Sequence, residues 1–246
     1  MKKRFSYSNV GGFLSGMLLL LVMVSCEKQG MKACLEPEGD TLTKTLKFES
    51  FFGVEVDADV DVFVAQGLPQ SIQVMGHSNL LDELKTEVSG GALRVISERC
   101  FSEDGKRPKV YVTIPEITRL DVSGTGNIYT DKLICDILEV KLGGAGQLIV
   151  NAESKKTITT LNGSGVISLI GSSNSHWVNL GGSGKIYSFL LPSNDVNVDL
   201  SGYGTVEVNA IKKLHAKISG SGEVRYKGQP EVESEISGLG KLIPVD

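Results

Sequence analysis

The sequence predicts an all-β protein whose main body is a parallel β-helix, that is, a β-solenoid. One observation is a repeat: a Gly-x-Gly motif flanked by branched apolar residues occurs seven times in residues 120–246, at intervals of 18 to 20 residues. The other is strict alternation of apolar and polar residues within each copy. A period of this size is typical of a solenoid, whose units bury their apolar sides only by stacking.

The seven motifs supply 14 of the 29 glycines of the chain. They are Gly124, Gly126, Gly144, Gly146, Gly163, Gly165, Gly182, Gly184, Gly202, Gly204, Gly220, Gly222, Gly238 and Gly240. In the fifth copy, the apolar residues from Val196 to Val208 and both glycines share one parity, which indicates a strand with one buried face. We therefore expect the glycines to point inward, at a corner where the coil leaves no room for a Cβ.

Composition is that of an ordinary globular protein with excess glycine. The 246 residues are 41% hydrophobic and 22% charged, with a formal net charge of −4. No cluster of basic residues follows Arg4, so the sequence predicts no nucleic-acid partner. About seven regular rungs are expected in residues 120–246, preceded by irregular rungs in residues 45–119; together they form one domain, 45–246.

Residues 1–25 have the organisation of a secretory signal. Lys2, Lys3 and Arg4 precede a short apolar stretch, and Ser25 and Cys26 follow it. A cysteine directly after a small residue resembles a bacterial lipobox, which predicts that Cys26 is lipidated and anchors the mature chain to a membrane. A plain signal peptide cut elsewhere is the alternative. The polar residues 26–44 are expected to be a flexible tether.

Alternation begins at Thr45. The segment from Val54 to Val64 is expected to be a strand with valines on its buried side and acidic residues on its solvated side. Residues 79–88 form the one credible helix, with Ser78 or Asn79 as its N-cap. Further strands are expected at residues 71–74, 93–97 and 110–114.

Cysteine spacing allows one internal disulfide at most, because Cys34, Cys100 and Cys135 remain after Cys26. The sequence does not choose the pair. No spacing fits a metal site, and no cofactor is predicted.

A carbohydrate-active enzyme is the alternative to a binding protein, because polysaccharide lyases and hydrolases also use parallel β-helices. Such chemistry needs acids concentrated on one face. The outward residues three positions before each first glycine instead alternate in sign. They are Asp121, Lys141, Thr160, Asn179, Asp199, Lys217 and Glu235. His176 and His215 are expected on different faces, and His77 lies in the capping region, so we assign no catalytic residue.

Surface aromatic residues are the candidates for stacking on a sugar. They are Tyr129, Trp177, Tyr187 and Tyr203. The small residues at the glycine corners form a flat strip that suits a glycan, a surface protein or a second copy of the chain, although small residues also simply fit a tight corner.

The seven copies, with Val110-Tyr-Val-Thr-Ile-Pro115 before the first and Tyr226-Lys-Gly-Gln-Pro230 before the last, resemble a known family. It is the putative auto-transporter adhesin head GIN-domain family of secreted bacterial proteins. The resemblance covers residues 45–242. It implies a right-handed single-stranded β-helix, often on a lipoprotein, and a role in adhesion without catalytic residues. We therefore expect a non-enzymatic lipoprotein of the cell envelope, anchored to the outer membrane of a Gram-negative bacterium on its periplasmic or outer side.

Overall fold

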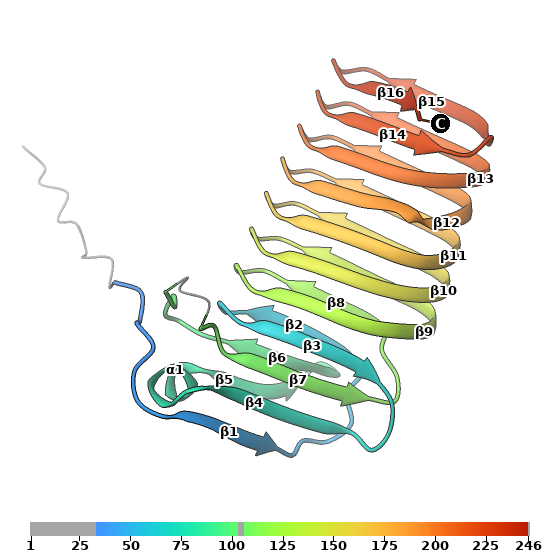
Figure 1. The fold of residues 1–246 in the computed structure, drawn as a ribbon. Coiled ribbons are helices and arrows are strands. Elements are labelled where there is room, and N and C mark those ends of the chain that lie inside the picture. The colour runs from blue at the N-terminus through green and yellow to red at the C-terminus, as the bar shows by residue number, and fades with distance from the viewer. Residues whose placement is uncertain (1–32, 103–105, 246) are drawn as a thin grey trace, which may run out of the picture. The chain divides into compact units, whose positions relative to one another are not determined.

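The structure, a computed structural model, describes residues 33–102 and 106–245. The predicted β-solenoid is confirmed: the rungs stack from β9 to β16 (Figure 1). The chain crosses the front of each rung from left to right in Figure 1 and returns behind it from right to left while rising, so the coil is right-handed.

Each regular rung has two walls joined by two corners. After the glycine corner, at the left of Figure 1, the chain forms the front wall, turns at a bend within the long strand, and returns as the back wall. Consecutive rungs pair as parallel strands. The strands are β8 (Arg119–Val122), β9 (Asn127–Leu142), β10 (Gln147–Leu161), β11 (Val166–Leu180), β12 (Lys185–Leu200), β13 (Thr205–Ile218), β14 (Glu223–Lys227), β15 (Glu231–Ile236) and β16 (Lys241–Pro244).

The interior consists of columns of branched aliphatic side chains. In the first six motifs, the residues two positions before the first glycine pair in register, and each is at most 1% exposed: Val122, Leu142, Leu161, Leu180, Leu200 and Ile218. In the same six motifs, the residues two positions after the second glycine are also fully buried: Ile128, Leu148, Ile167, Ile186, Val206 and Val224. Complete burial of one such side chain stabilises a fold by about 1.5–3 kcal/mol relative to leaving it exposed. These two columns explain why each motif is flanked by apolar residues.

The corner glycines do not point inward as predicted. A Cβ on Gly182 would overlap the carbonyl oxygen of Gly163 in the preceding rung, and a Cβ on Gly202 would overlap that of Gly182. The absent side chain is therefore directed along the stack, at the neighbouring backbone. At the second glycine of a pair a core side chain adds to the obstacle, because a Cβ on Gly184 would lie 2.8 Å from Leu161 Cδ2. Glycine is required here by the close approach of successive rungs.

The second corner, which is the bend within each long strand, is irregular. Every register shift among β9–β13 falls near it. The shifts lie between Ile149 and Asn151, between Ser168 and Ile170, between Ser188 and Pro192, and between Ser193 and Asp195.

The interior beside this bend is polar. The Ser154 hydroxyl lies 2.8 Å from Thr157 Oγ1 and 3.0 Å from Ser173 Oγ. His176 Nε2 lies 3.0 Å from Thr159 Oγ1, and the imidazole is 1% exposed. This burial lowers the pKa of His176 to about 3, because the charged form would be removed from water. The hydroxyls and the neutral imidazole satisfy one another where the aliphatic columns end.

Residues before 115 cover the end of the solenoid at which β8 and β9 lie. In this part of the fold, strands that are neighbours in space are not consecutive along the chain. The elements are β1 (Thr41–Leu46), β2 (Gly53–Asp57), β3 (Asp61–Gln66), β4 (Ser71–His77), α1 (Ser78–Glu83), β5 (Lys85–Ser89), β6 (Ala92–Ile96) and β7 (Lys109–Ile114). β2 lies between β6 and β8, and β3 lies between β7 and β9, all in parallel. β4, β5 and β1 then pair antiparallel with β7, β6 and β4. The irregular rungs are thus two parallel rungs covered by an antiparallel layer.

Two predicted elements have different bounds in the structure. The expected strand from Val54 to Val64 is split into β2 and β3, because the chain turns at residues 58–60 to form the corner of this first rung. The expected helix at residues 79–88 is shorter: α1 ends at Glu83, Leu84 is extended, and the following residues pair with β6 as β5. The N-cap position is His77, and neither Ser78 nor Asn79.

Residues 34–44, which the sequence analysis assigns to a flexible tether, are attached to this end of the fold. Cys34 and Cys100 form a disulfide, and Leu35 bridges in parallel with Phe101. β1 follows along β4. Cys135 is free and half-buried. Among the described residues, no helix is long and apolar enough to cross a bilayer.

Candidate ligand-binding face

The four predicted aromatic residues are not brought together. Tyr129 and Tyr187 lie on the front wall, where Ile149 and Ser168 separate them in one column of paired residues. Trp177 lies on the back wall. Tyr203 stands at a glycine corner, 79% exposed. They therefore do not form one aromatic site, and each has to be judged by its surroundings.

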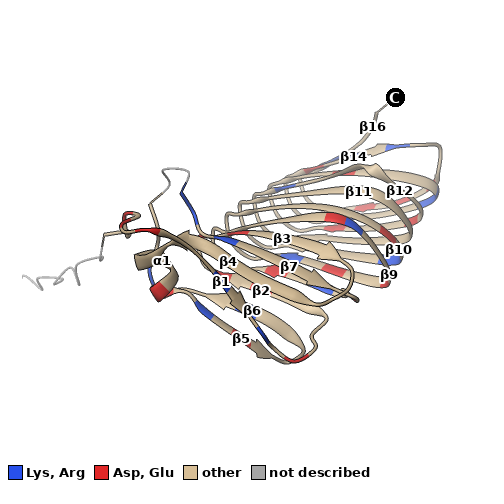
Figure 2. Ribbon diagram, turned by 60° about the horizontal axis from the view of Figure 1, so that its bottom comes forward, with Lys and Arg blue, Asp and Glu red and all other residues tan. Residues whose placement is uncertain are grey.

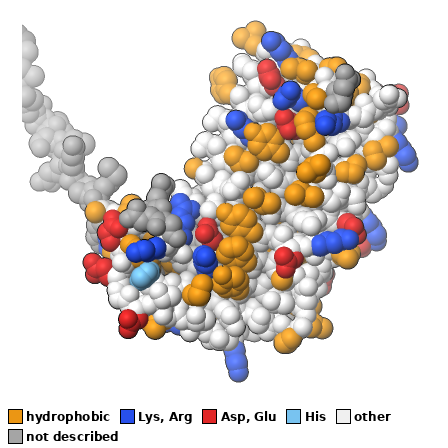
Figure 3. Space-filling view, viewed as in Figure 1, with side chains coloured by type: hydrophobic (Ala, Val, Ile, Leu, Met, Phe, Trp, Pro, Cys, Tyr) orange, Lys and Arg blue, Asp and Glu red, His pale blue; other side chains and the backbone are white. Residues whose placement is uncertain are grey.

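Tyr129 is already stacked within the protein. Its ring lies on that of Phe63, with centroids 5.3 Å apart, and Phe63 lies on Tyr111 at 5.1 Å. The interplanar angles of 19° and 16° show that the rings stack face to face along the solenoid axis. The viewed front of the molecule carries a line of hydrophobic side chains across the rungs (Figure 3). These rings present their edges to solvent, so Tyr129 is poorly placed to stack on a sugar.

Trp177 has a different environment. It is 47% exposed, and its indole Nε1 donates to Ser175 Oγ at 3.1 Å, which fixes the ring. Lys156 Nζ lies 4.4 Å from the ring centroid, so a cation from the preceding rung covers one face. On the next rung, the residue in register with Trp177 is Asn197, which has a short side chain. The indole therefore has no large side chain in register with it on that side.

Three outward rows cross the back wall around Trp177, and we call this surface the Trp177 face. Its first row, seven positions before each first glycine, is Lys156, Ser175, Asp195, Lys213 and Glu231. The second row, five positions before, is Ile158, Trp177, Asn197, His215 and Glu233. The third row, three positions before, is Thr160, Asn179, Asp199, Lys217 and Glu235. This third row stacks as the sequence predicted, with Lys217 between two acids.

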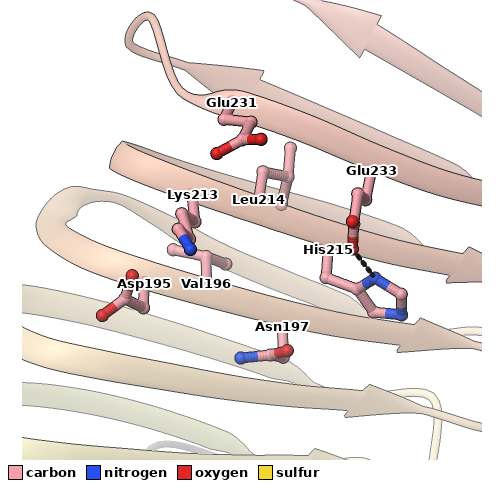
Figure 4. Close-up of a pocket in the computed structure, with 8 residues that line it drawn as sticks. All are labelled: Asp195, Val196, Asn197, Lys213, Leu214, His215, Glu231 and Glu233. Carbon is pink, nitrogen blue, oxygen red and sulfur yellow. Dashed lines mark hydrogen bonds and ion pairs between the residues drawn. The ribbon is translucent and has the colours of Figure 1, made fainter.

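A hollow of about 490 Å³ lies over β12, β13 and β15 in the first two rows (Figure 4). Its outward side chains are Asp195, Asn197, Lys213, His215, Glu231 and Glu233. His215 Nδ1 lies 3.3 Å from Glu233 Oε2, as the dashed line in Figure 4 marks. Trp177 does not line this hollow; it lies one rung before it, in register with the lining residue Asn197.

A second hollow, of about 330 Å³, lies nearer the glycine corners. Amide, hydroxyl and charged side chains line it: Asn162, Asn179, Asp199, Ser201, Lys217 and Ser219. Asn179 follows Trp177 by two residues on β11, so the two side chains are outward neighbours along the strand. Trp177 lines neither hollow, but it is in register with Asn197 of the first and lies two residues before Asn179 of the second.

Charges on the Trp177 face are of both signs, and the ion pair that the structure describes there is the one between His215 and Glu233. Elsewhere on the solenoid some outward charges form ion pairs, such as Lys132 with Glu153 at 2.6 Å and Arg225 with Glu207 at 3.2 Å. On the Trp177 face, among the described residues, Asp195, Lys213 and Glu231 align in register without an ion pair within 4.0 Å. Acidic and basic residues are both distributed over the rungs of the solenoid (Figure 2). The unpaired groups on this face are available to hydrogen-bond a ligand.

The arrangement is a poor one for acid–base catalysis. His176 is buried in the core and His215 is on the surface, so they lie on different sides of the wall, as predicted. Burial raises the pKa of Asp121, and Lys141 beside it opposes that effect, but Asp121 lies away from both hollows. Within the described part of the chain, no three His, Cys, Asp or Glu residues are placed to hold a metal ion.

The first two rows of the Trp177 face escaped the sequence analysis, which followed only the residues three positions before each first glycine. The same spacing argument extended to five and seven positions would have aligned Trp177 with Asn197 and His215. Cys26 lies outside the described residues, so its lipidation stays a prediction.

Comparisons with known proteins agree with this fold. A crystal structure of a putative adhesin from Bacteroides fragilis matches with a TM-score of 0.78 and 20% identity, over 86% of this chain and 100% of that one. A putative lipid binding protein from Parabacteroides distasonis matches with a TM-score of 0.71 and 24% identity, over 87% and 100%. A putative adhesin from Parabacteroides merdae matches at 0.67 and 21%, over 86% and 99%.

No curated protein sequence matches the chain. The family model described as "Putative auto-transporter adhesin, head GIN domain" matches residues 50–230, which include both hollows apart from Glu231 and Glu233. With most of its length matched, the chain belongs to this family of adhesin head domains.

Proposed function

We propose that this protein is a non-enzymatic, lipid-anchored adhesin of the cell envelope that binds a glycan through the Trp177 face. The observation that carries the proposal is the setting of Trp177. Lys156 Nζ lies over one side of its indole, and Asn197, the residue in register with it on the next rung, lines a polar hollow. An aromatic plane next to amide, hydroxyl and charged groups is suited to a sugar ring, which has an apolar C–H face and polar edges.

Binding is favoured over catalysis by the pattern of charge. The acids of the face are interleaved with Lys213, Lys217 and His215 in paired rows. Glycoside hydrolysis requires two carboxyl groups facing each other across a bond, with the pKa of the acid raised. The acid with a raised pKa on this wall is Asp121, away from the hollows. The family description, an adhesin, points in the same direction.

The proposed anchoring rests on the lipobox-like sequence that ends at Cys26. Six residues, 27–32, separate Cys26 from Ala33. An extended segment of that length spans roughly 20 Å, so a lipidated Cys26 would keep the domain close to the bilayer. This supports a rigid module displayed at an envelope membrane of a Gram-negative bacterium. Replacing Cys26→Ala should release the protein from membranes and abolish labelling by a fatty-acid analogue.

The binding proposal is tested by retention of the purified protein on immobilised amylose, mannan and β-1,3-glucan. Trp177→Ala should abolish retention, and Tyr187→Ala is the matched control, because Tyr187 is an outward aromatic residue of the opposite wall. Equal retention of the two variants, with unchanged melting temperatures, would contradict the assignment. Release of reducing ends from any of these polymers by the wild-type protein would favour the enzymatic alternative.

A further inference from the structure

We infer that the Trp177 face binds a segment of a neutral polysaccharide at least three sugar units long, rather than a single sugar. This inference rests on the proposed function and names the ligand class of the same site. It starts from the two hollows that share Trp177 as a neighbour.

The hollows follow one another along the strands. β12 contributes Asp195 and Asn197 to the first hollow and Asp199 to the second, and Ser201, which directly follows β12, also lines the second. A strand rises about 3.3 Å per residue, so the distance from Asp195 to Ser201 is roughly 20 Å. That length is several times the width of one sugar ring. A monosaccharide on Trp177 would leave most of the polar groups without a contact.

The second hollow has the chemistry of a site for hydroxyl groups. Asn162, Asn179, Ser201 and Ser219 offer amide and hydroxyl groups, which both donate and accept hydrogen bonds. Neighbouring hydroxyls of a sugar need this combination, because each is a donor and an acceptor. Asp199 and Lys217 add one charge of each sign, so the hollow has no net charge.

The first hollow argues against an acidic polymer. Three carboxylates, those of Asp195, Glu231 and Glu233, line it together with one amine, that of Lys213. Carboxylates outnumber basic side chains here even when His215 is counted with Lys213, so the hollow would repel uronate or sulfate groups. A neutral polysaccharide can form hydrogen bonds in both hollows, because the carboxylates of the first hollow accept hydrogen bonds from sugar hydroxyls.

The test compares ligands by length and variants by hollow. We would titrate the wild-type protein by calorimetry with gluco- and manno-oligosaccharides of one, three and six units, and with polygalacturonate as the acidic polymer. The hexasaccharide of the sugar that binds should bind at least ten-fold more tightly than its monosaccharide. Polygalacturonate should not bind.

The variants separate the two hollows. Asn197→Ala, next to Trp177, should weaken every oligosaccharide, whereas Asn179→Ala combined with Asp199→Ala should weaken the hexasaccharide several-fold more than the trisaccharide. Melting temperatures show that each variant folds. Equal affinity for one and six units, or binding of polygalacturonate as tight as that of the neutral hexasaccharide, would overturn this inference and leave adhesion intact. Failure of all neutral polymers and oligosaccharides to bind would overturn the proposed function itself.

Discussion

The chain turns twice in each rung, at the glycine corner and at the bend, and the two turns differ in how regularly successive rungs align. At the glycine corner, successive copies keep one register, and a side chain on the first glycine would strike the carbonyl oxygen of the rung before it. At the bend, registers shift by one or more residues and the interior holds Thr157, Ser173 and His176 in place of an aliphatic column. One corner is fixed by backbone contact, and the other tolerates variation.

This difference explains why the period of the repeat varies. β9 and β10 are offset by 20 residues at Asn127 and Gln147 but by 19 residues at Leu142 and Leu161. The change occurs at the bend, between Ile149 and Asn151. Evenly spaced glycine motifs are therefore unnecessary, because each rung adjusts its length near the bend, where the register shifts.

The largest difference in stability between the two corners should come from inserting one residue at each of them in separate variants. A serine inserted between Gly182 and Ser183 displaces a backbone that lies against the neighbouring rungs and should cost about 3 kcal/mol, or a fall in melting temperature of roughly 6–12 °C. A serine inserted between Asn194 and Asp195, at the bend, should cost less than about 1 kcal/mol. Thermal unfolding of both variants measures this. Equal losses would show that the bend is as constrained as the glycine corner.

The second largest loss of stability should come from adding a single side chain at the glycine corner. Gly182→Val should destabilise the fold by about 1–3 kcal/mol or more, because its Cβ meets the backbone of the preceding rung, which cannot rotate away. Ser183→Val, one residue later and exposed, should stay within about 0.5 kcal/mol. Urea denaturation gives both values. If Ser183→Val is as damaging as Gly182→Val, the direction assigned to the missing side chain is wrong.

At the bend, the buried imidazole should make stability depend on pH. The pKa of His176 is about 3 in the folded protein and near 6.5 in the unfolded chain, so between these values the unfolded state binds a proton that the folded state does not. Stability is therefore lost as the pH falls below 6.5, by about 1.4 kcal/mol per pH unit. A double variant, His176→Leu with Thr159→Val, should lose this component. Denaturation at pH 7 and pH 5 compares the two proteins, and parallel losses would exclude His176 as the cause.

The smallest effect is expected at the outer surface of the glycine corner. Tyr203→Ala removes a ring that is 79% exposed, so stability should change by less than about 0.5 kcal/mol. Retention on neutral polysaccharides should also be unchanged, since Tyr203 lies outside the Trp177 face. Loss of retention in this variant would place part of the binding surface along the corner edge.

Sequence reasoning succeeded where the physics is local and periodic. The parity around Val198 and Leu200 defines the wall, and the glycine spacing defines the rung, because every copy repeats the same short-range pattern. The direction of the missing Cβ was not accessible, because it depends on the distance between rungs. The same holds for the hydroxyl contacts of Ser154, which join residues of two rungs.

The closed end was the least predictable part. β2 and β3 precede β6 and β7 in the chain, although β6 and β7 form the rung outside them. No local sequence pattern reveals that β4 runs antiparallel to β7. The helix was overextended because Leu84 to Val88 suits a helix by composition, while pairing with β6 makes it a strand. Cys34 and Cys100 become partners only once Leu35 and Phe101 are seen to pair.

The disulfide between Cys34 and Cys100 also determines how a mechanical load would travel through this domain. A pull on the chain before Cys34 enters the fold there and passes through the covalent bond to the segment between β6 and β7. β1, an exposed edge strand paired on one side with β4, lies inside the closed loop and would carry no tension. In reducing conditions the same pull would peel β1 from β4 first. A module tethered at one end and bound at the other would thus resist detachment by a bond instead of by an edge strand, and pulling single molecules from residue 33 with and without reductant would show the difference.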